Sequence, residues 1–211
     1  MDEGTTTMGT EPTVFVVDDE PIIRTSLERL MQSVSLKVET FATASEFLDA
    51  YTTGQPGCVV LDVRMPGISG LDLQDRMAER GVDIPIIFIT AYGDVPMAVR
   101  ALKGGAVDFL QKPYNNQTLL DRVQEAIEKD VRARSERAKH DDLAALFGEL
   151  TPREHEVMDM VVAGKANREI AVALGLSAKT IEVHRAHVMR KLKVDSLADL
   201  VRLYLAYRKS A

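Results

Sequence analysis

Several short apolar runs, each followed closely by a carboxylate, a hydroxyl or an ammonium group, constrain the fold more than any other feature. The runs are Thr13–Val17 before Asp18 and Asp19, Cys58–Leu61 before Asp62, Pro85–Ile89 before Thr90, and Val107–Leu110 before Lys112. Continuous apolar runs rich in β-branched residues are typical of strands buried on both faces of a parallel sheet. Because the carboxyl ends of parallel strands meet at one edge, we expect these polar groups to converge there.

Segments in which apolar residues recur at helical spacing separate these strands. They begin at Pro21, Ser45, Leu71, Asp94 and Asn116, and a further strand with alternating polarity is expected at Leu36–Phe41. Five strands that alternate with five helices predict an α/β fold built on a five-stranded, doubly wound parallel sheet.

The last third of the chain predicts a different structure. No strand pattern returns after Leu143, and Thr151–Glu154 has the sequence of a helix start with a capping box. Gly164 ends that helix, Asn167 is expected to cap the next one, and Ser177 is expected to cap a third. Two short helices joined by a glycine-containing turn are typical of a helix-turn-helix, so we expect a small all-α domain here.

Charge also divides the chain. Residues 1–130 contain 11 Lys and Arg against 21 Asp and Glu, whereas residues 131–211 contain 15 against 11, so an acidic part precedes a basic part. The charge-rich segment between them lacks Pro and Gly and predicts a helical linker, with a flexible tether as the alternative. The predicted division is a tail at 1–12, an α/β domain at 13–127, a linker at 128–143 and a helical domain at 144–211.

Composition argues against several other classes of protein. The longest apolar runs, such as Ile84–Ile89, are too short to span a bilayer, and residues 1–10 lack the apolar segment of a secretory signal. The single cysteine, Cys58, rules out an internal disulfide framework. We therefore expect a cytoplasmic protein with no membrane association.

The polar groups at the strand ends suggest phosphoryl chemistry. Three carboxylates held close together repel each other, and a divalent hard cation relieves that cost. A carboxylate in such a place can act as a nucleophile and become an aspartyl phosphate. Lys112 can pair with phosphoryl oxygens, and the Thr90 hydroxyl can donate a hydrogen bond to one of them. Taken alone, a lysine such as Lys112 is usually a surface residue.

These residues, in this order, resemble the receiver domain of two-component response regulators. The motifs are Val-Asp-Asp-Glu at 17–20, Leu-Asp-Val-Arg-Met-Pro-Gly at 61–67, Ile-Thr-Ala at 89–91 and Gln-Lys-Pro at 111–113. The resemblance implies a flavodoxin-like fold over residues 13–127. It also implies a phosphoacceptor at Asp62, Mg²⁺ (or Mn²⁺) ligands at Asp18, Asp19, Asp62 and the main-chain carbonyl of Arg64, and phosphate-binding or switch residues at Thr90, Ala91, Lys112 and Phe109. Without the resemblance, Phe109 is explained by core packing.

The C-terminal motifs resemble a LuxR-type DNA-binding domain. They are Thr-Pro-Arg-Glu at 151–154, Asn-Arg-Glu-Ile-Ala at 167–171 and the basic segment at 180–192. The resemblance implies DNA-binding residues at Lys179, Thr180, Glu182, Val183, His184, Arg185, Ala186 and Lys191. Within this set Glu182, Val183 and Ala186 are expected to face bases, and most of the others phosphates. Without the resemblance, a basic helical face is explained as solvated surface.

Together the two resemblances imply a FixJ/NarL-type response regulator. A sensor histidine kinase is expected to phosphorylate Asp62, which releases the DNA-binding domain and makes the protein dimerise through the receiver. The dimer is then expected to bind promoter DNA and regulate transcription, with RNA polymerase as a further partner. Activation is the common outcome in the family. No enzymatic activity is expected beyond slow self-dephosphorylation, because the bulky Arg64 and Tyr92 are placed to hinder an attacking water.

Two alternatives come from other classes of protein. A haloacid-dehalogenase-type phosphohydrolase uses the same kinds of groups, but it expects a second aspartate two residues after the nucleophile, where Arg64 stands. A phosphate sink whose C-terminal module binds protein is the other alternative, and the basic segment Thr180–Leu192 argues against it.

Overall fold

The computed structural model describes residues 11–210, so most of the predicted tail at 1–12 lies outside the described residues. The chain forms two compact units that divide between Arg134 and Ser135. Each unit has its own hydrophobic core, and each is described by itself.

The first unit is built on one parallel sheet. Its strands are β1 (Thr13–Val17), β2 (Lys37–Phe41), β3 (Gly57–Asp62), β4 (Ile86–Thr90) and β5 (Asp108–Gln111). They lie side by side in the order β2-β1-β3-β4-β5, and every neighbouring pair is parallel. The predicted five-stranded, doubly wound fold is therefore confirmed.

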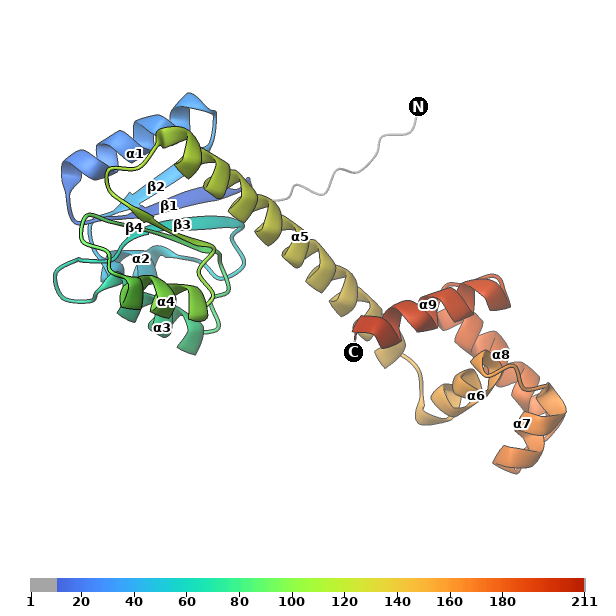
Figure 1. Ribbon diagram of the computed structural model, residues 1–211. Coiled ribbons are helices and arrows are strands. Elements are labelled where there is room, and N and C mark those ends of the chain that lie inside the picture. The colour runs from blue at the N-terminus through green and yellow to red at the C-terminus, as the bar shows by residue number, and fades with distance from the viewer. Residues whose placement is uncertain (1–10, 211) are drawn as a thin grey trace, which may run out of the picture. The chain divides into compact units, whose positions relative to one another are not determined.

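Helices cover both faces of this sheet, as Figure 1 shows. They are α1 (Pro21–Ser33), α2 (Ala44–Ala50), α3 (Gly70–Glu79), α4 (Val95–Lys103) and α5 (Asn116–Gly148). Helices α1 and α5 bury Leu27 and Val123 against one face, while α2, α3 and α4 pack side chains such as Phe47 and Leu73 on the other. Because both faces are covered, β1, β3 and β4 are buried along their whole length, as their unbroken apolar sequences require.

Local side-chain caps start three of the helices that follow strands. The Thr43, Ser69 and Asp94 side chains accept hydrogen bonds from main-chain N–H groups in the first turns of α2, α3 and α4. Each cap satisfies a donor that has no partner within its helix. The sequence thereby fixes where the chain turns back from the carboxyl edge of the sheet.

A buried carboxylate holds α5 against the amino end of β3. Asp130, whose exposed fraction is 3%, accepts hydrogen bonds from the main-chain N–H of Gly57 at 2.9 Å and from Nε of Arg134 at 2.6 Å. Gly57 cannot be replaced easily, because a Cβ there would lie 1.9 Å from the main-chain oxygen of Thr13. Residues 130 and 134, which the sequence placed in the linker, therefore pack with the first unit.

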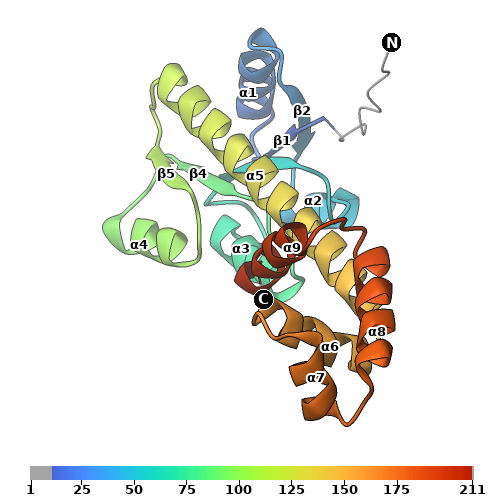
Figure 2. The ribbon, with the colours of Figure 1, turned by 90° about the vertical axis from the view of Figure 1, so that its right-hand side faces the viewer.

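The second unit is helical (Figure 2). It contains the end of α5 together with α6 (Pro152–Val162), α7 (Asn167–Leu174), α8 (Ala178–Lys191) and α9 (Leu197–Ser210). Its core includes Phe147, Val157, Ile170 and Val188. In residues 11–210, no helix is both long and apolar enough to cross a bilayer.

Helix starts in the second unit follow the sequence prediction with one exception. Thr151 and Glu154 form the predicted capping box, and the Ser177 side chain caps α8. The prediction that Asn167 caps α7 is wrong, because Ala166 occupies the cap position and Asn167 is the first helical residue. The main-chain N–H of Ala166 donates instead to the Glu169 carboxylate at 2.7 Å, which leaves the Asn167 amide available for another partner.

Candidate functional site

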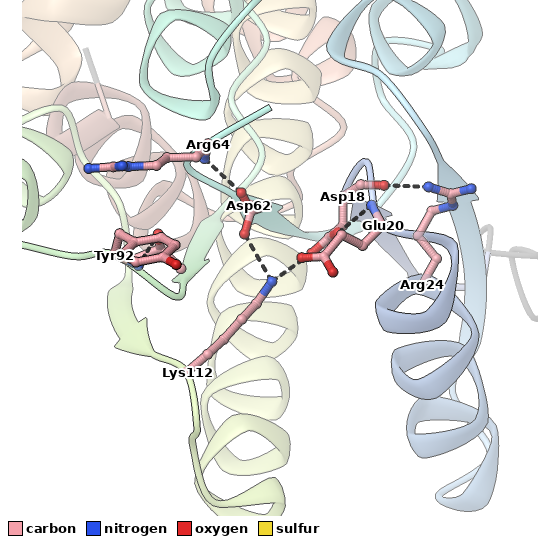
Figure 3. A network of polar contacts seen from close by, with 8 residues as sticks. Asp18, Glu20, Arg24, Asp62, Arg64, Tyr92 and Lys112 are labelled. Carbon is pink, nitrogen blue, oxygen red and sulfur yellow. Dashed lines mark hydrogen bonds and ion pairs between the residues drawn. The ribbon is translucent and has the colours of Figure 1, made fainter. Parts of the chain in front are cut away.

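The predicted strand-end residues of the first unit lie at the carboxyl edge of the sheet. Asp18 follows β1, Asp62 ends β3, Thr90 ends β4 and Lys112 follows β5. Asp18 is fully buried, and the exposed fraction of Asp62 is 6%. Figure 3 shows the two carboxylates pointing toward the same ammonium group.

Lys112 joins the two carboxylates. Its Nζ lies 2.9 Å from Oδ2 of Asp18 and 2.9 Å from Oδ1 of Asp62. Two carboxyl groups and one ammonium group therefore share a largely buried site, where an unpaired carboxylate would be costly.

Burial and pairing act in opposite directions on the protonation of this cluster. Burial raises the pKa of Asp62 above its ordinary value, although the hydrogen bond from Lys112 works against the rise. Burial alone would lower the pKa of Lys112, but its hydrogen bonds to Asp18 and Asp62 outweigh that effect and raise it. Lys112 is therefore a firmly charged cation at neutral pH.

Main-chain donors hold the two carboxylates, and a side-chain donor holds the main chain at Asp18. The N–H of Arg64 donates to Oδ2 of Asp62 at 2.6 Å, and the N–H of Glu20 donates to Oδ1 of Asp18 at 2.9 Å. In addition, Nη1 of Arg24 donates to the main-chain oxygen of Asp18 at 2.6 Å (Figure 3). The sequence reasoning missed Arg24, and the only available signal was its position one helical turn after Glu20.

One predicted metal ligand, Asp19, is not grouped with the carboxylates of Asp18 and Asp62. Asp19 is partly buried and lines an open hollow together with Arg64 and Ser69. Within the described residues, no three His, Cys, Asp or Glu side chains are grouped so that they could hold a metal ion as they stand. The carboxylates that the structure does bring together are those of Asp18 and Asp62, around Lys112.

The predicted switch residues lie beside this cluster. The Thr90 hydroxyl is buried and accepts a hydrogen bond from the N–H of Tyr92 at 3.2 Å, while Ala91 is exposed. Phe109 is partly buried and packs on Phe88 with 6.2 Å between ring centres. Phe109 therefore packs against the hydrophobic core of the first unit in this structure.

Helix α8 of the second unit carries the residues predicted to bind DNA. Lys179, Glu182, Val183 and Ala186 are exposed, whereas Thr180, His184, Arg185 and Lys191 are partly buried. Lys179 and Glu182 form an ion pair of 3.1 Å on the exposed face. The exposed set contains all three residues that the resemblance directs at bases.

Lys191 is engaged inside the second unit. Its Nζ donates to Oε2 of Glu154 at 2.6 Å and to the main-chain oxygen of Glu149 at 3.0 Å. Burial would raise the pKa of Glu154, but Lys191 and the donors of Thr151 outweigh it and lower the pKa to about 2. Glu154 therefore connects the start of α6 to the end of α8.

Comparisons with known proteins agree with both halves of this description. The family model of the response regulator receiver domain matches residues 14–124, and that of the bacterial regulatory proteins of the luxR family matches residues 148–204. Nodulation protein W of Bradyrhizobium diazoefficiens is 48% identical over 200 residues, which cover 95% of this chain and 88% of that protein.

Solved structures of similar proteins give the same result. The response regulator StyR is 46% identical, with a TM-score of 0.89 over 94% of this chain and 100% of that one. Full-length FixJ from B. japonicum is 41% identical, with a TM-score of 0.57 over 95% of this chain and 98% of that one. The chain therefore belongs to the FixJ-like two-component response regulators, in which a receiver domain is joined to a LuxR-type DNA-binding domain that regulates transcription.

Proposed function

We propose that this protein acts in the cytoplasm and that Asp62 accepts a phosphoryl group from the phosphohistidine of a sensor kinase. An Asp62 oxygen forms the new O–P bond while the P–N bond of the donor breaks and the imidazole leaves with its electron pair. The observation that carries this proposal is the buried Asp62 carboxylate, 2.9 Å from Lys112 at the sheet edge. Lys112 and Thr90 then bind phosphoryl oxygens, small Ala91 leaves them room, and Phe109 repacks.

We assign the Mg²⁺ site, which Mn²⁺ can also fill, to Asp18, Asp19, Asp62 and the main-chain carbonyl of Arg64. These donors are all oxygen atoms, which suits a hard cation. Asp18 and Asp62 already share one cationic group, the ammonium of Lys112, which supports their affinity for positive charge. When bound, the ion neutralises charge on the transferring phosphoryl group.

We assign DNA contacts to the exposed residues of α8 and to Thr180, His184 and Arg185. Glu182 is suited to accept from a cytosine amino group, and Val183 to contact a thymine methyl group. Lys191 is better explained as a structural partner of Glu154, because its ammonium is already paired at 2.6 Å.

We assign Asp130 and Arg134 to the receiver domain and place the start of the linker after Arg134.

Phosphorylation is proposed to promote dimerisation and binding to two half-sites in promoter DNA, where RNA polymerase is the further partner. A duplex selected from a random library should bind about tenfold more tightly, or better, after treatment with beryllofluoride and Mg²⁺, because two half-sites are then engaged by one dimer. Gel shift and size-exclusion chromatography measure the two effects. Equal affinity and equal oligomeric state with and without treatment would contradict the proposal.

Arg64 and Tyr92 are proposed to slow the loss of the phosphoryl group. The Arg64 guanidinium carbon lies 5.2 Å from the ring centre of Tyr92, so the two side chains form one cover beside Asp62 (Figure 3). Arg64→Ala or Tyr92→Ala should speed hydrolysis about threefold to tenfold, a barrier change of about 1 kcal/mol. Decay of the labelled protein measures this rate, with Arg80→Ala as the control. An unchanged decay rate in both variants would refute the role.

A further inference from the structure

A side-chain hydrogen bond connects α8, the helix that carries the proposed DNA contacts, to α7. Nη1 of Arg185 donates to Oδ1 of Asn167 at 2.8 Å, and Asn167 is the first residue of α7. Arg185 is partly buried and borders a small apolar hollow with Val157 and Val188. We propose that Asn167 is a positioning residue, which holds the guanidinium of Arg185 ready for a DNA phosphate.

The charge of the partner distinguishes Arg185 from two other basic residues on α8, Lys179 and Lys191. Lys179 is paired with the Glu182 carboxylate and Lys191 with the Glu154 carboxylate, so each of those positive charges is offset. The partner of Arg185 is an uncharged amide. Arg185 is thus fixed in place while its full charge stays available to a phosphate.

The guanidinium of Arg185 has enough N–H donors to bind both Asn167 and a DNA phosphate. It carries five N–H groups, and the contact with Asn167 uses one of them. The stem is held by apolar neighbours and the head by the amide, so less side-chain entropy is lost when the phosphate binds. The Asn167 amide can serve here because Glu169, and not Asn167, satisfies the N–H at the cap of α7.

A double-mutant cycle on the full chain, activated with beryllofluoride and Mg²⁺, tests the coupling. The probe is a duplex selected from a random library by the unchanged protein. Asn167→Ala should weaken binding about threefold to tenfold, because Arg185 loses its preferred position. Arg185→Ala should weaken it more, and the double variant should bind no more weakly than Arg185→Ala alone. Asn116→Ala is the matched control, since Asn116 is likewise the first residue of a helix.

A second variant separates positioning from charge. Asn167→Asp should keep Arg185 in place but offset its charge, so the slope of log affinity against log salt should fall in magnitude by about one. Asn167→Ala should leave that slope unchanged. Additive losses in the cycle would mean that Asn167 contacts DNA independently, which overturns the proposal, as would normal binding by Asn167→Ala.

This inference rests on the proposed DNA contact of Arg185, and the two can fail separately. If Arg185→Ala binds with unchanged affinity and salt slope, the contact itself is absent and both statements are overturned. If Arg185→Ala weakens binding and Asn167→Ala does not, only the positioning role of Asn167 is overturned. Thermal unfolding of each variant identifies losses of DNA affinity that come from misfolding. If Asn167→Ala misfolds, the salt dependence of binding by Asn167→Asp tests the proposal in its place.

Discussion

Asp62→Asn should reduce labelling by acetyl phosphate or by phosphorylated kinase to the background level. An amide lacks the anionic oxygen that attacks phosphorus, so the covalent step has no nucleophile. The substitution preserves shape, and Lys112 keeps its ion pair with Asp18 at 2.9 Å. We therefore expect a folded protein whose DNA affinity no longer responds to phosphodonor.

The measurement is uptake of labelled phosphoryl group in the presence of Mg²⁺, with hydroxylamine sensitivity as the mark of an acyl phosphate. Asp49→Asn is the matched control, because Asp49 is an exposed aspartate of the same unit. It should label like the unchanged protein. Normal labelling of Asp62→Asn would show that another group accepts the phosphoryl group.

The sheet and the residues at its carboxyl edge were predictable because both depend on short-range pattern. The apolar runs around Val14–Val17 and Cys58–Leu61 are long enough to predict buried strands, and parallel order then places Asp18 and Asp62 together. Alternation with helices left few possible topologies. The cluster around Lys112 follows from that order, although its 2.9 Å distances do not.

The contacts that sequence did not predict join residues that are distant along the chain. The resemblance placed Lys191 in the DNA-binding set, but its partner Glu154 lies 37 residues earlier. Which side of a helix faces inward depends on how its neighbours pack, and a basic stripe does not encode that. Asn167 was expected to cap its own helix, and it bonds Arg185 instead.

The burial of Asp130 also depends on a contact with a residue distant along the chain, and Asp130 lies in a segment without apolar periodicity. Asp130 and Arg134 are four residues apart on α5, a spacing typical of exposed surface pairs. The hydrogen bond from the main chain of Gly57, 73 residues earlier, makes Asp130 a buried anchor. A charge-rich linker and a packed helix end therefore have the same sequence signature, and tertiary structure decides between them.

Glu154→Ala should destabilise the DNA-binding unit by about 3 kcal/mol. Oε2 of Glu154 accepts from Lys191 at 2.6 Å and from the Thr151 N–H at 2.8 Å, and the Glu154 side chain is 5% exposed. Removing the carboxylate leaves a partly buried ammonium and an uncapped helix N–H, each of which costs free energy. Hydrogen exchange at the amides of α6 to α8 in the full chain measures this loss separately from the receiver.

Acidification should cause part of the same loss of stability in the DNA-binding unit. The folded pKa of Glu154 is about 2, below its ordinary value of 4.5, so its contribution to stability is complete above pH 4.5. It is lost as the pH falls from 4.5 toward 2, because the unfolded chain binds the proton more tightly. Glu154→Gln should keep the helix cap and lose this pH dependence, whereas Glu156→Gln, at an exposed glutamate of the same helix, should retain it. If Glu154→Gln loses stability with acid as steeply as the unchanged protein, the Glu154–Lys191 pair does not supply the acid-sensitive stability.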